Sequence, residues 1–148
     1  NGKDVTTVVR GPDAGLLAST YASQQMVREC LISRQRFERQ APGLVADGRD
    51  MGTVVFPDAT LKVFLTATLK IRAQRRYKQL LEKGFSATLA GVENEVSARD
   101  QKDSTRAVSP LVPANDAVVL DTTEIGIDQV VKKVDDLLTA RLVQGGNG

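Results

Sequence analysis

The alternation of short apolar runs with segments of helical periodicity constrains the fold of this chain most. The apolar runs are Leu44–Ala46, Leu61–Leu65 and Ala117–Leu120. Uninterrupted apolar runs of this length are typical of strands covered on both faces, as in parallel sheets. Because helical patterns separate the runs, the sequence predicts an α/β fold with a mainly parallel sheet. Asp4–Arg10 is predicted to form a further short strand.

The first three predicted helices are defined by apolar spacing and by residues that begin and end helices. One long helix is expected over Ala14–Gln40, where apolar residues recur at helical spacing. Thr68 is expected to cap a helix that ends at Gly84. Ser86 is expected to cap another helix, which runs to about Arg99 or beyond.

The carboxyl-terminal part of the chain is predicted to contain an extended connector, a helix and a tail. Residues 107–116 include two prolines and should be extended. A helix is predicted over Ile127–Val143, followed from about residue 144 by a flexible glycine-rich tail. The apolar stripe predicted to be buried on this helix consists of Val130, Val131, Val134, Leu137, Leu138 and Leu142.

The composition excludes several kinds of site. The 148 residues contain no histidine, so a Ser-His-Asp triad and a histidine zinc site are excluded. Cys30 is the single cysteine, so the chain can form no internal disulfide. Only 4% of the residues are aromatic, which argues against a protein that stacks single-stranded nucleic acid bases. No apolar stretch approaches the roughly 18 residues that a membrane helix needs.

The first candidate site is the charged segment that follows the run at residues 44–46. In open α/β sheets, ligands bind beyond the carboxyl ends of strands. Arg49 could bind a phosphate there, and Asp50 could accept a hydrogen bond from a base or a sugar. Asp47, at the end of the expected strand, could orient a magnesium-bound water. A solvent-exposed turn with a local ion pair explains the same residues equally well.

The second candidate is a stripe of alternating charge on one helical face, formed by Arg99, Asp103 and Arg106. These residues could hold an anion at the arginines and a hydroxyl at the aspartate. Ordinary salt bridges on a helix surface are the simpler explanation of the spacing alone. Asp100 and Lys102 fall on other faces and are expected to be solvated.

Two further groups are weaker. Arg75 and Arg76, with Arg72, share a helical face that could neutralise a transferring phosphoryl group, although a solvated basic face is the commoner reason for such spacing. Ser19 and Arg28 lie on the first long helix, where nothing local distinguishes them. The phosphate-binding motif G-x-x-x-x-G-K-[ST] occurs nowhere in the 148 residues.

Three sequence blocks taken together resemble bacterial cytidylate kinases. They are LVADGRDMGTVVFPDATLKVFLTATLKIRAQRR, LLEKGFS and ARDQKDSTRAVSPLVPANDAVVLDTT. The resemblance extends from about Gly2 to about Val143 and implies a P-loop nucleoside monophosphate kinase fold. It also implies transfer of the ATP γ-phosphoryl group to CMP or dCMP, with Mg²⁺ bound together with ATP, as part of pyrimidine nucleotide metabolism.

The resemblance also implies roles for individual residues. Ser19, Arg28 and Asp50 match positions that recognise the pyrimidine. Arg49 and Arg106 match arginines that hold the acceptor phosphate. The remaining matches are Arg99 and Asp103 near ribose and phosphate, Arg75 and Arg76 near the ATP phosphates, and Asp47 beside the phosphate loop.

The same resemblance divides the chain into functional parts. Residues 1–40 belong to the monophosphate-binding lobe, 41–80 to a partial core, 81–105 to a mobile lid, and 106–148 to the core again. The family's central P-loop strand precedes the first residue of this sequence. We therefore expect the 148 residues alone to be inactive, and the gap to be filled by a preceding segment or by a second chain at the sheet edge.

Two alternatives to the kinase stay open at this stage. One is a catalytically dead module that binds CMP, and the other is a structural or interaction domain that pairs through an exposed sheet edge. In each case the expected partners exclude nucleic acid and membranes. Because no secretory signal is visible, the expected location is cytoplasmic.

Overall fold

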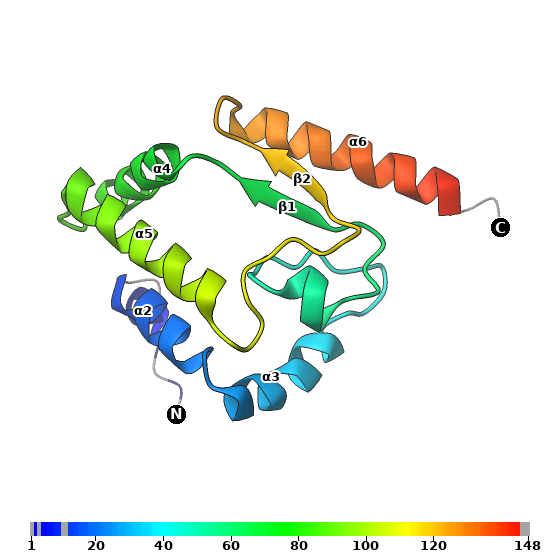
Figure 1. The fold of residues 1–148 in the computed structure, drawn as a ribbon, viewed down its shortest axis with the longest axis horizontal. Helices are drawn as coiled ribbons and strands as arrows, with labels where there is room; N and C mark the ends of the chain where they lie inside the picture. The colour runs from blue at the N-terminus through cyan, green and yellow to red at the C-terminus, as the bar shows by residue number, and fades with distance from the viewer. Residues whose placement is uncertain (1, 3, 10–11, 146–148) are drawn as a thin grey trace.

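The computed structural model of this chain describes residues 2, 4–9 and 12–145. The structure consists of helices and a small parallel sheet, which lies toward one side of the molecule (Figure 1). The elements in chain order are α1 (Thr6–Val9), α2 (Pro12–Tyr21), α3 (Gln25–Phe37), the π-helical turn η1 (Met51–Val55), β1 (Val63–Thr66), α4 (Leu69–Glu82), α5 (Leu89–Thr105), β2 (Val118–Asp121) and α6 (Ile127–Gly145).

The sheet contains two of the four strands that the sequence predicts, those near residues 61–65 and 117–120. Strands β1 and β2 are parallel, with Val63 opposite Val118 and Thr66 opposite Asp121. The connection between them contains α4 and α5, as a parallel pair requires. The predicted mainly parallel α/β arrangement is therefore confirmed, although the described residues form a sheet of only two strands.

Two predicted strands are not formed in the described part of the chain. Thr6–Val9 is a short helix, and the Asp4 carboxylate accepts a hydrogen bond from the Thr6 amide at its start. Residues 44–46 have no ladder hydrogen bonds, and the Val45 side chain is 97% exposed. A strand needs a neighbour for its amide and carbonyl groups, and neither segment has one among the described residues.

The helix predicted over residues 14–40 is divided into α2 and α3. The α-helical pattern stops at Tyr21 and resumes at Gln25. Between them, Ser23 donates from both its amide and its hydroxyl to the Thr20 carbonyl. This local hydrogen bonding offers the backbone an alternative to the helix, which explains a break without glycine or proline.

Helices α4 and α5 form a hairpin around the main apolar cluster. Ala73, Leu80 and Val92 are buried, and Tyr77 and Phe85 pack against them. The Thr68 hydroxyl caps α4 as predicted, and the helix ends before Gly84, whose φ is +78°. The predicted cap of α5 is wrong by two residues, because the hydroxyl of Thr88, rather than that of Ser86, accepts from the Gly91 amide.

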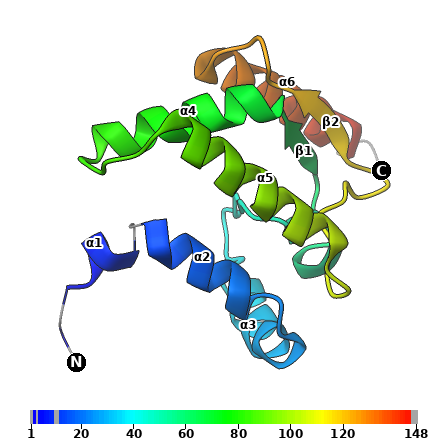
Figure 2. The ribbon, with the colours of Figure 1, turned by 60° about the vertical axis from the view of Figure 1, so that its left-hand side comes forward.

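Helix α6 lies beside β2 and is only partly buried (Figures 1 and 2). Of the predicted stripe, Val130, Val134 and Leu137 are half-buried. The other three side chains, Val131, Leu138 and Leu142, are exposed. The helix continues to Gly145, so residues 144 and 145 are helical rather than tail, and residues 146–148 lie outside the described residues.

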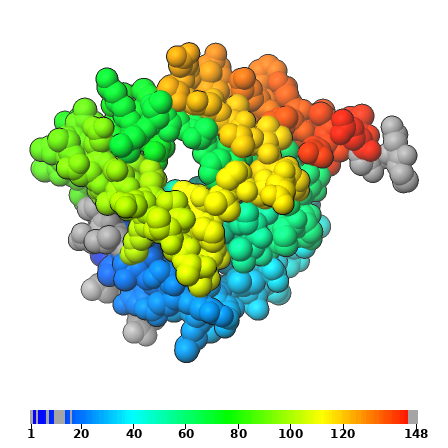
Figure 3. Space-filling model, viewed as in Figure 1, coloured from blue at the N-terminus to red at the C-terminus, as the bar shows by residue number. Residues whose placement is uncertain are grey.

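The elements are arranged as a ring rather than as stacked layers. Figure 3 shows an opening through the molecule, bordered by α4, α5, the strands and the connector that follows α5. Helices α2 and α3 lie along the side opposite α6 (Figure 1). Among the described residues, none of the helices is long and apolar enough to cross a membrane.

Candidate functional site

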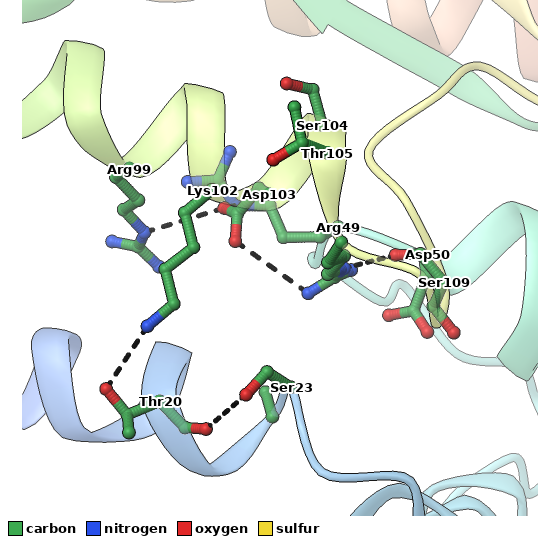
Figure 4. A network of polar contacts seen from close by, with 12 residues as sticks. Thr20, Ser23, Arg49, Asp50, Arg99, Lys102, Asp103, Ser104, Thr105 and Ser109 are labelled. Carbon is green, nitrogen blue, oxygen red and sulfur yellow. Dashed lines mark hydrogen bonds and ion pairs between the residues drawn. The ribbon is translucent and has the colours of Figure 1, made fainter.

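The centre of the candidate site is Asp103, in the last turn of α5. This aspartate is 3% exposed. Its carboxylate lies 3.3 Å from Arg49 Nε, 3.8 Å from Arg99 Nε and 3.8 Å from Arg106 Nη1. Figure 4 shows Arg49 and Arg99 approaching it from opposite sides. Three guanidinium groups around one carboxylate leave an excess of positive charge, which suits a site for an anion.

A second buried ion pair lies beside the first. Asp50 is 5% exposed and pairs with Arg28 on α3. Arg28 also donates from Nε to the Ser109 hydroxyl at 3.1 Å and from Nη1 to the Ala22 carbonyl at 3.0 Å. Burial, and then the positive charge of Arg106, hold the pKa of Arg28 below its usual value. The two arginines are therefore close enough to interact electrostatically.

The π-helical turn η1 fixes the backbone on which Asp50 lies. The Asp50 carbonyl accepts hydrogen bonds from the Val54 amide at 2.9 Å and the Val55 amide at 3.2 Å. Arg36 on α3 donates to the carbonyls of Val54 and Val55 at 2.9 and 2.8 Å. A helix end leaves such carbonyls without partners, and Arg36 satisfies two of them. Arg36 thus attaches the last two residues of η1, at the end away from Asp50, to α3.

Four buried polar atoms of the described residues make no hydrogen bond within the protein. They are Ser19 Oγ, Arg106 Nη2, Asp50 Oδ2 and Asp103 Oδ2. The two carboxylate oxygens still take part in ion pairs, with Arg28 and Arg49 respectively. Buried polar groups are rarely left unpaired, so Ser19 Oγ and Arg106 Nη2 are the atoms best placed to bond a ligand.

A hollow of about 380 Å³ adjoins this network. Arg28 and Ser109 line it, together with apolar side chains that include Ile32 and Val54. Of the predicted site residues, Arg28 alone lines this hollow, and the Asp103 cluster lies beside it. Four of its eight lining residues are polar or charged, namely Gln25, Arg28, Glu29 and Ser109, and the other four are apolar.

Six of the ten predicted site residues form two linked ion-pair clusters: Arg28, Asp50, Arg49, Arg99, Asp103 and Arg106. Ser19 is buried, and its helix adjoins α5 through the hydrogen bond from Lys102 to Thr20 (Figure 4). These groups come from residues 19–50 and 99–106, which are remote along the chain.

The other three predicted residues lie elsewhere. Arg75 binds the carboxyl end of β2, where it donates to the hydroxyl and carbonyl of Thr122 and to the Ile125 carbonyl. Arg76 is half-buried on α4. Asp47 is exposed in the segment before Arg49.

Sequence reasoning missed several contacts that build the site. Ser109 bonds both Arg28 and Arg106, since its carbonyl accepts from Arg106 Nε. Lys102, expected to be solvated, is exposed but donates to Thr20 at 3.3 Å. Asp100, also expected to be solvated, is half-buried and pairs with Arg72 of α4. Apart from the bond between Arg106 and Ser109, these pairings join residues 28 to 82 positions apart, and no local pattern could have indicated them.

The described residues provide no ready metal site. No group of three or more aspartate, glutamate or cysteine side chains is close enough to hold an ion in this part of the chain. Mg²⁺ needs oxygen ligands in near-octahedral geometry, commonly from one or two carboxylates together with substrate phosphates and water. Asp47 could supply one such carboxylate, and the remaining ligands of an Mg²⁺ ion would then come from substrate phosphates and water.

Comparison with known proteins gives one consistent family. A sequence model of cytidylate kinases matches residues 1–140. The chain is 54% identical over 140 residues to the cytidylate kinase of Pseudomonas entomophila, which is 95% of this chain and 61% of that protein. It is 54% identical to the cytidylate kinase of Ralstonia pickettii over 99% of this chain and 62% of that protein. For the enzyme of Azotobacter vinelandii, the identity is 54% and the coverage is 97% of this chain and 63% of that protein. The chain thus spans about three fifths of the length of these relatives.

Proposed function

Because the chain belongs to the cytidylate kinase family, we propose that it forms the substrate-binding and lid part of an enzyme that phosphorylates CMP or dCMP. The reaction transfers the γ-phosphoryl group of ATP and gives CDP or dCDP. The observation that carries this proposal is the convergence of Arg49, Arg99 and Arg106 on the buried Asp103. Phosphoryl transfer needs positioning and charge neutralisation far more than covalent help, and this cluster offers both.

The base end of the nucleotide is assigned to Ser19, Arg28 and Asp50. Asp50 is an acceptor and suits the exocyclic amino group of cytosine, which is a donor. Arg28 has donors left for the acceptor atoms of the pyrimidine ring. Ser19 contributes a buried hydroxyl that makes no hydrogen bond within the described residues. Uracil presents an oxygen where cytosine presents the amino group, so it would face the Asp50 carboxylate with an acceptor.

The phosphate end is assigned to Arg49 and Arg106. Arg106 is largely buried, and its Nη2 makes no hydrogen bond within the described residues, so it is ready to bond a phosphate oxygen. Arg49 is more exposed and can rotate toward the same phosphate. Asp103 holds the arginines together and, with Arg99, faces the ribose and phosphate side. A phosphate that binds here would take over part of the charge neutralisation that Asp103 provides in this structure.

The donor side is assigned to Arg75, Arg76 and Asp47, with residues 81–105 as the lid. Closure of a lid over the phosphates excludes water and prevents wasteful hydrolysis of ATP. Mg²⁺ bound with the ATP phosphates supplies further charge neutralisation when the nucleotide is present. In this assignment residues 1–40 form the monophosphate-binding lobe, and residues 41–80 and 106–148 belong to the core. The cytoplasmic location remains a prediction.

A CMP-binding module without transferase activity is the second candidate. The 148 residues, which span about three fifths of the length of their relatives, do not include the motif G-x-x-x-x-G-K-[ST] that cradles the ATP phosphates. We therefore propose that these residues, supplied alone, bind CMP but do not turn over ATP. The third candidate is an interaction domain that pairs through the two-stranded sheet, whose edges lack a partner strand among the described residues.

Calorimetry with CMP, UMP and AMP, together with a coupled kinase assay, separates these candidates. We expect CMP to bind more tightly than UMP or AMP, and Asp50→Asn to remove this preference. Ser97→Ala serves as the control, since Ser97 is exposed on α5. No CMP binding would reject the substrate assignment and favour the interaction domain. CMP-dependent ATP turnover by the 148 residues alone would reject their proposed inactivity.

A further inference from the structure

Ser109 occupies an unusual position in the connector that follows α5. It is a non-glycine residue with a φ of +51°, a left-handed conformation that L residues rarely adopt. Its two polar groups serve two different arginines. The hydroxyl accepts from Arg28 Nε at 3.1 Å, and the carbonyl accepts from Arg106 Nε. Neither the composition nor the family resemblance singled out this residue.

The turn at Ser109 is anchored to the end of α5. The Leu111 amide donates to the Asp103 carbonyl at 2.8 Å, which ties the connector to the helix turn that carries the central carboxylate. Strained backbone conformations persist where surrounding contacts over-determine them, and they concentrate at functional sites. Here the left-handed turn directs one residue toward both Arg28 and Arg106.

The hydroxyl of Ser109 completes the fixation of Arg28. A guanidinium group has five N–H donors in a rigid fork. Three partners already bond the guanidinium group of Arg28, namely Ser109 at Nε, Ala22 at Nη1 and Asp50 at Nη2. One donor is left on each terminal nitrogen, and Arg28 lines the hollow beside the site. Because the fork is rigid and planar, the contact of Ser109 with Nε contributes to the direction of these two donors together with the contacts of Ala22 and Asp50.

We propose that Ser109 is a positioning residue for nucleotide selectivity, acting through Arg28. Its hydroxyl sets the orientation in which Arg28 presents its free donors to a pyrimidine ring. Its carbonyl separately holds Arg106, which places the base-binding and phosphate-binding arginines at a fixed spacing. This inference rests on the proposed binding of CMP, but its structural part can be tested without a nucleotide.

The first test is the hydrogen exchange of the arginine Nε–H groups, measured by ¹⁵N NMR on the 148-residue chain. Ser109→Ala removes the hydroxyl and keeps the carbonyl. We expect exchange at Arg28 Nε–H to become about tenfold faster and exchange at Arg106 Nε–H to stay unchanged. Arg28→Lys identifies the Arg28 signal, and Ser97→Ala is the matched control. Unchanged exchange at Arg28 in Ser109→Ala would overturn the proposal.

The second test separates selectivity from stability. Ser109→Gly also removes the hydroxyl, but glycine adopts a positive φ without steric cost. We expect both variants to lose about tenfold in the ratio of CMP to UMP affinity. We expect Ser109→Gly to unfold at the same temperature as the parent or higher. If Ser109 had only a structural role, the ratio of CMP to UMP affinity would fall only in a variant that is also less stable. An unaltered ratio in the stable variant Ser109→Gly would therefore overturn the proposal.

The two tests fail in distinguishable ways. If the parent chain binds no CMP, the proposed function is wrong, and the exchange measurement alone decides whether Ser109 positions Arg28. If the parent chain binds CMP selectively and both variants retain that selectivity, the proposed function stands and the role of Ser109 is rejected.

Discussion

Asp103 is a single carboxylate that faces three arginines of unequal exposure. The side chains of Arg49 and Arg99 are 37% and 44% exposed, whereas that of Arg106 is 9% exposed. Water can solvate the first two charges if the carboxylate is lost, but it reaches Arg106 poorly. The contribution of Asp103 to folding therefore comes mainly from its pairing with Arg106, because an unpaired buried charge is costly.

Asp103→Asn should destabilise the fold strongly. We expect the free energy of unfolding to fall by about 3 kcal/mol, the order found when a buried ion pair loses one partner. The matched control is Asp136→Asn, since Asp136 pairs at 2.8 Å with Lys132 on the exposed face of α6. That change should cost less than about 0.5 kcal/mol. Urea denaturation of both variants measures the difference, and equal losses would contradict the central role of Asp103.

Lys62 and Asp116 give a titratable contact outside the site. The Lys62 ammonium group bonds both carboxylate oxygens at 2.8 Å and also the Pro57 carbonyl at 2.6 Å. Chiefly because of the hydrogen bond from Lys62, the pKa of Asp116 lies below its usual value. A carboxyl group whose pKa is lower in the folded state stabilises the fold above its unfolded-state pKa. That stabilisation is lost as the pH falls through the lowered, folded-state pKa.

Lys62→Met should therefore return the pKa of Asp116 toward its usual value. It should also remove the contribution of this pair to the loss of stability in acid. Titration of the carboxyl carbons by ¹³C NMR measures the pKa directly, and Lys133→Met is the control on α6. An unchanged Asp116 pKa in Lys62→Met would show that the contact does not form in solution.

At the scale of elements, the π-helical turn η1 depends on a contact that lies outside it. Arg36 holds the carbonyls of Val54 and Val55, and the amides of the same two residues hold the Asp50 carbonyl. The orientation of Asp50 thus depends on a side chain of α3. π-Helical turns are rare and are frequently found at functional sites, which agrees with the position of η1 directly after Asp50.

Arg36→Ala should loosen η1 without unfolding the molecule. We expect the backbone amides of Val54 and Val55 to exchange about tenfold faster, since each carbonyl loses a hydrogen bond from a charged donor. Arg34→Ala is the matched control, because Arg34 is exposed on the same helix. Native-state hydrogen exchange measures both variants. If Arg34→Ala has the same effect as Arg36→Ala, the clamp is not specific.

Whole-molecule shape depends on polar contacts between the amino-terminal helices and the rest. Helix α3 has no buried residue, and the large apolar side chains of Met26 and Phe37 are 76% and 73% exposed. The links across this boundary are charged or polar, chiefly Arg28 with Asp50 and Ser109, Arg36 with the carbonyls of Val54 and Val55, and Lys102 with Thr20. By contrast, an apolar cluster holds α4 to α5. Of the ion pairs at this boundary, Arg28 with Asp50 is buried, whereas Arg39 with Asp58 is exposed and therefore sensitive to salt.

High salt should open this boundary. The screening length falls from about 10 Å at 0.1 M salt to about 3 Å at 1 M, and the pair of Arg39, which follows α3, with Asp58 is exposed enough to be screened. We expect the radius of gyration from small-angle X-ray scattering to rise in 1 M NaCl, and CMP to reverse the rise. Asp136→Asn is the control, since it removes a charge far from the boundary. A radius of gyration independent of salt would contradict this prediction.

The sequence by itself determined the positions of those helices and strands that depend on residues within one helical turn or one apolar run. Helix α4 begins after Thr68, whose hydroxyl caps it, and ends before Gly84, which adopts a positive φ. Both requirements are local, since each concerns residues within one turn of the helix end. The apolar runs near residues 63 and 118 indicated two strands correctly, although each strand forms only because the other pairs with it. The sequence blocks also indicated the family, and the candidate residues they named include the two buried carboxylates, Asp50 and Asp103.

Tertiary structure decided what depends on partners distant along the chain. Residues 44–46 have strand-like composition but stay unpaired among the described residues, because a strand exists only with a neighbour. The spacing of Arg99, Asp103 and Arg106 alone favours ordinary salt bridges on a helix surface, and the approach of Arg49 to Asp103 makes the difference. Ser109 carries no local signal at all. Burial and pairing are properties of the assembled chain, since water satisfies the same groups wherever the fold leaves them exposed.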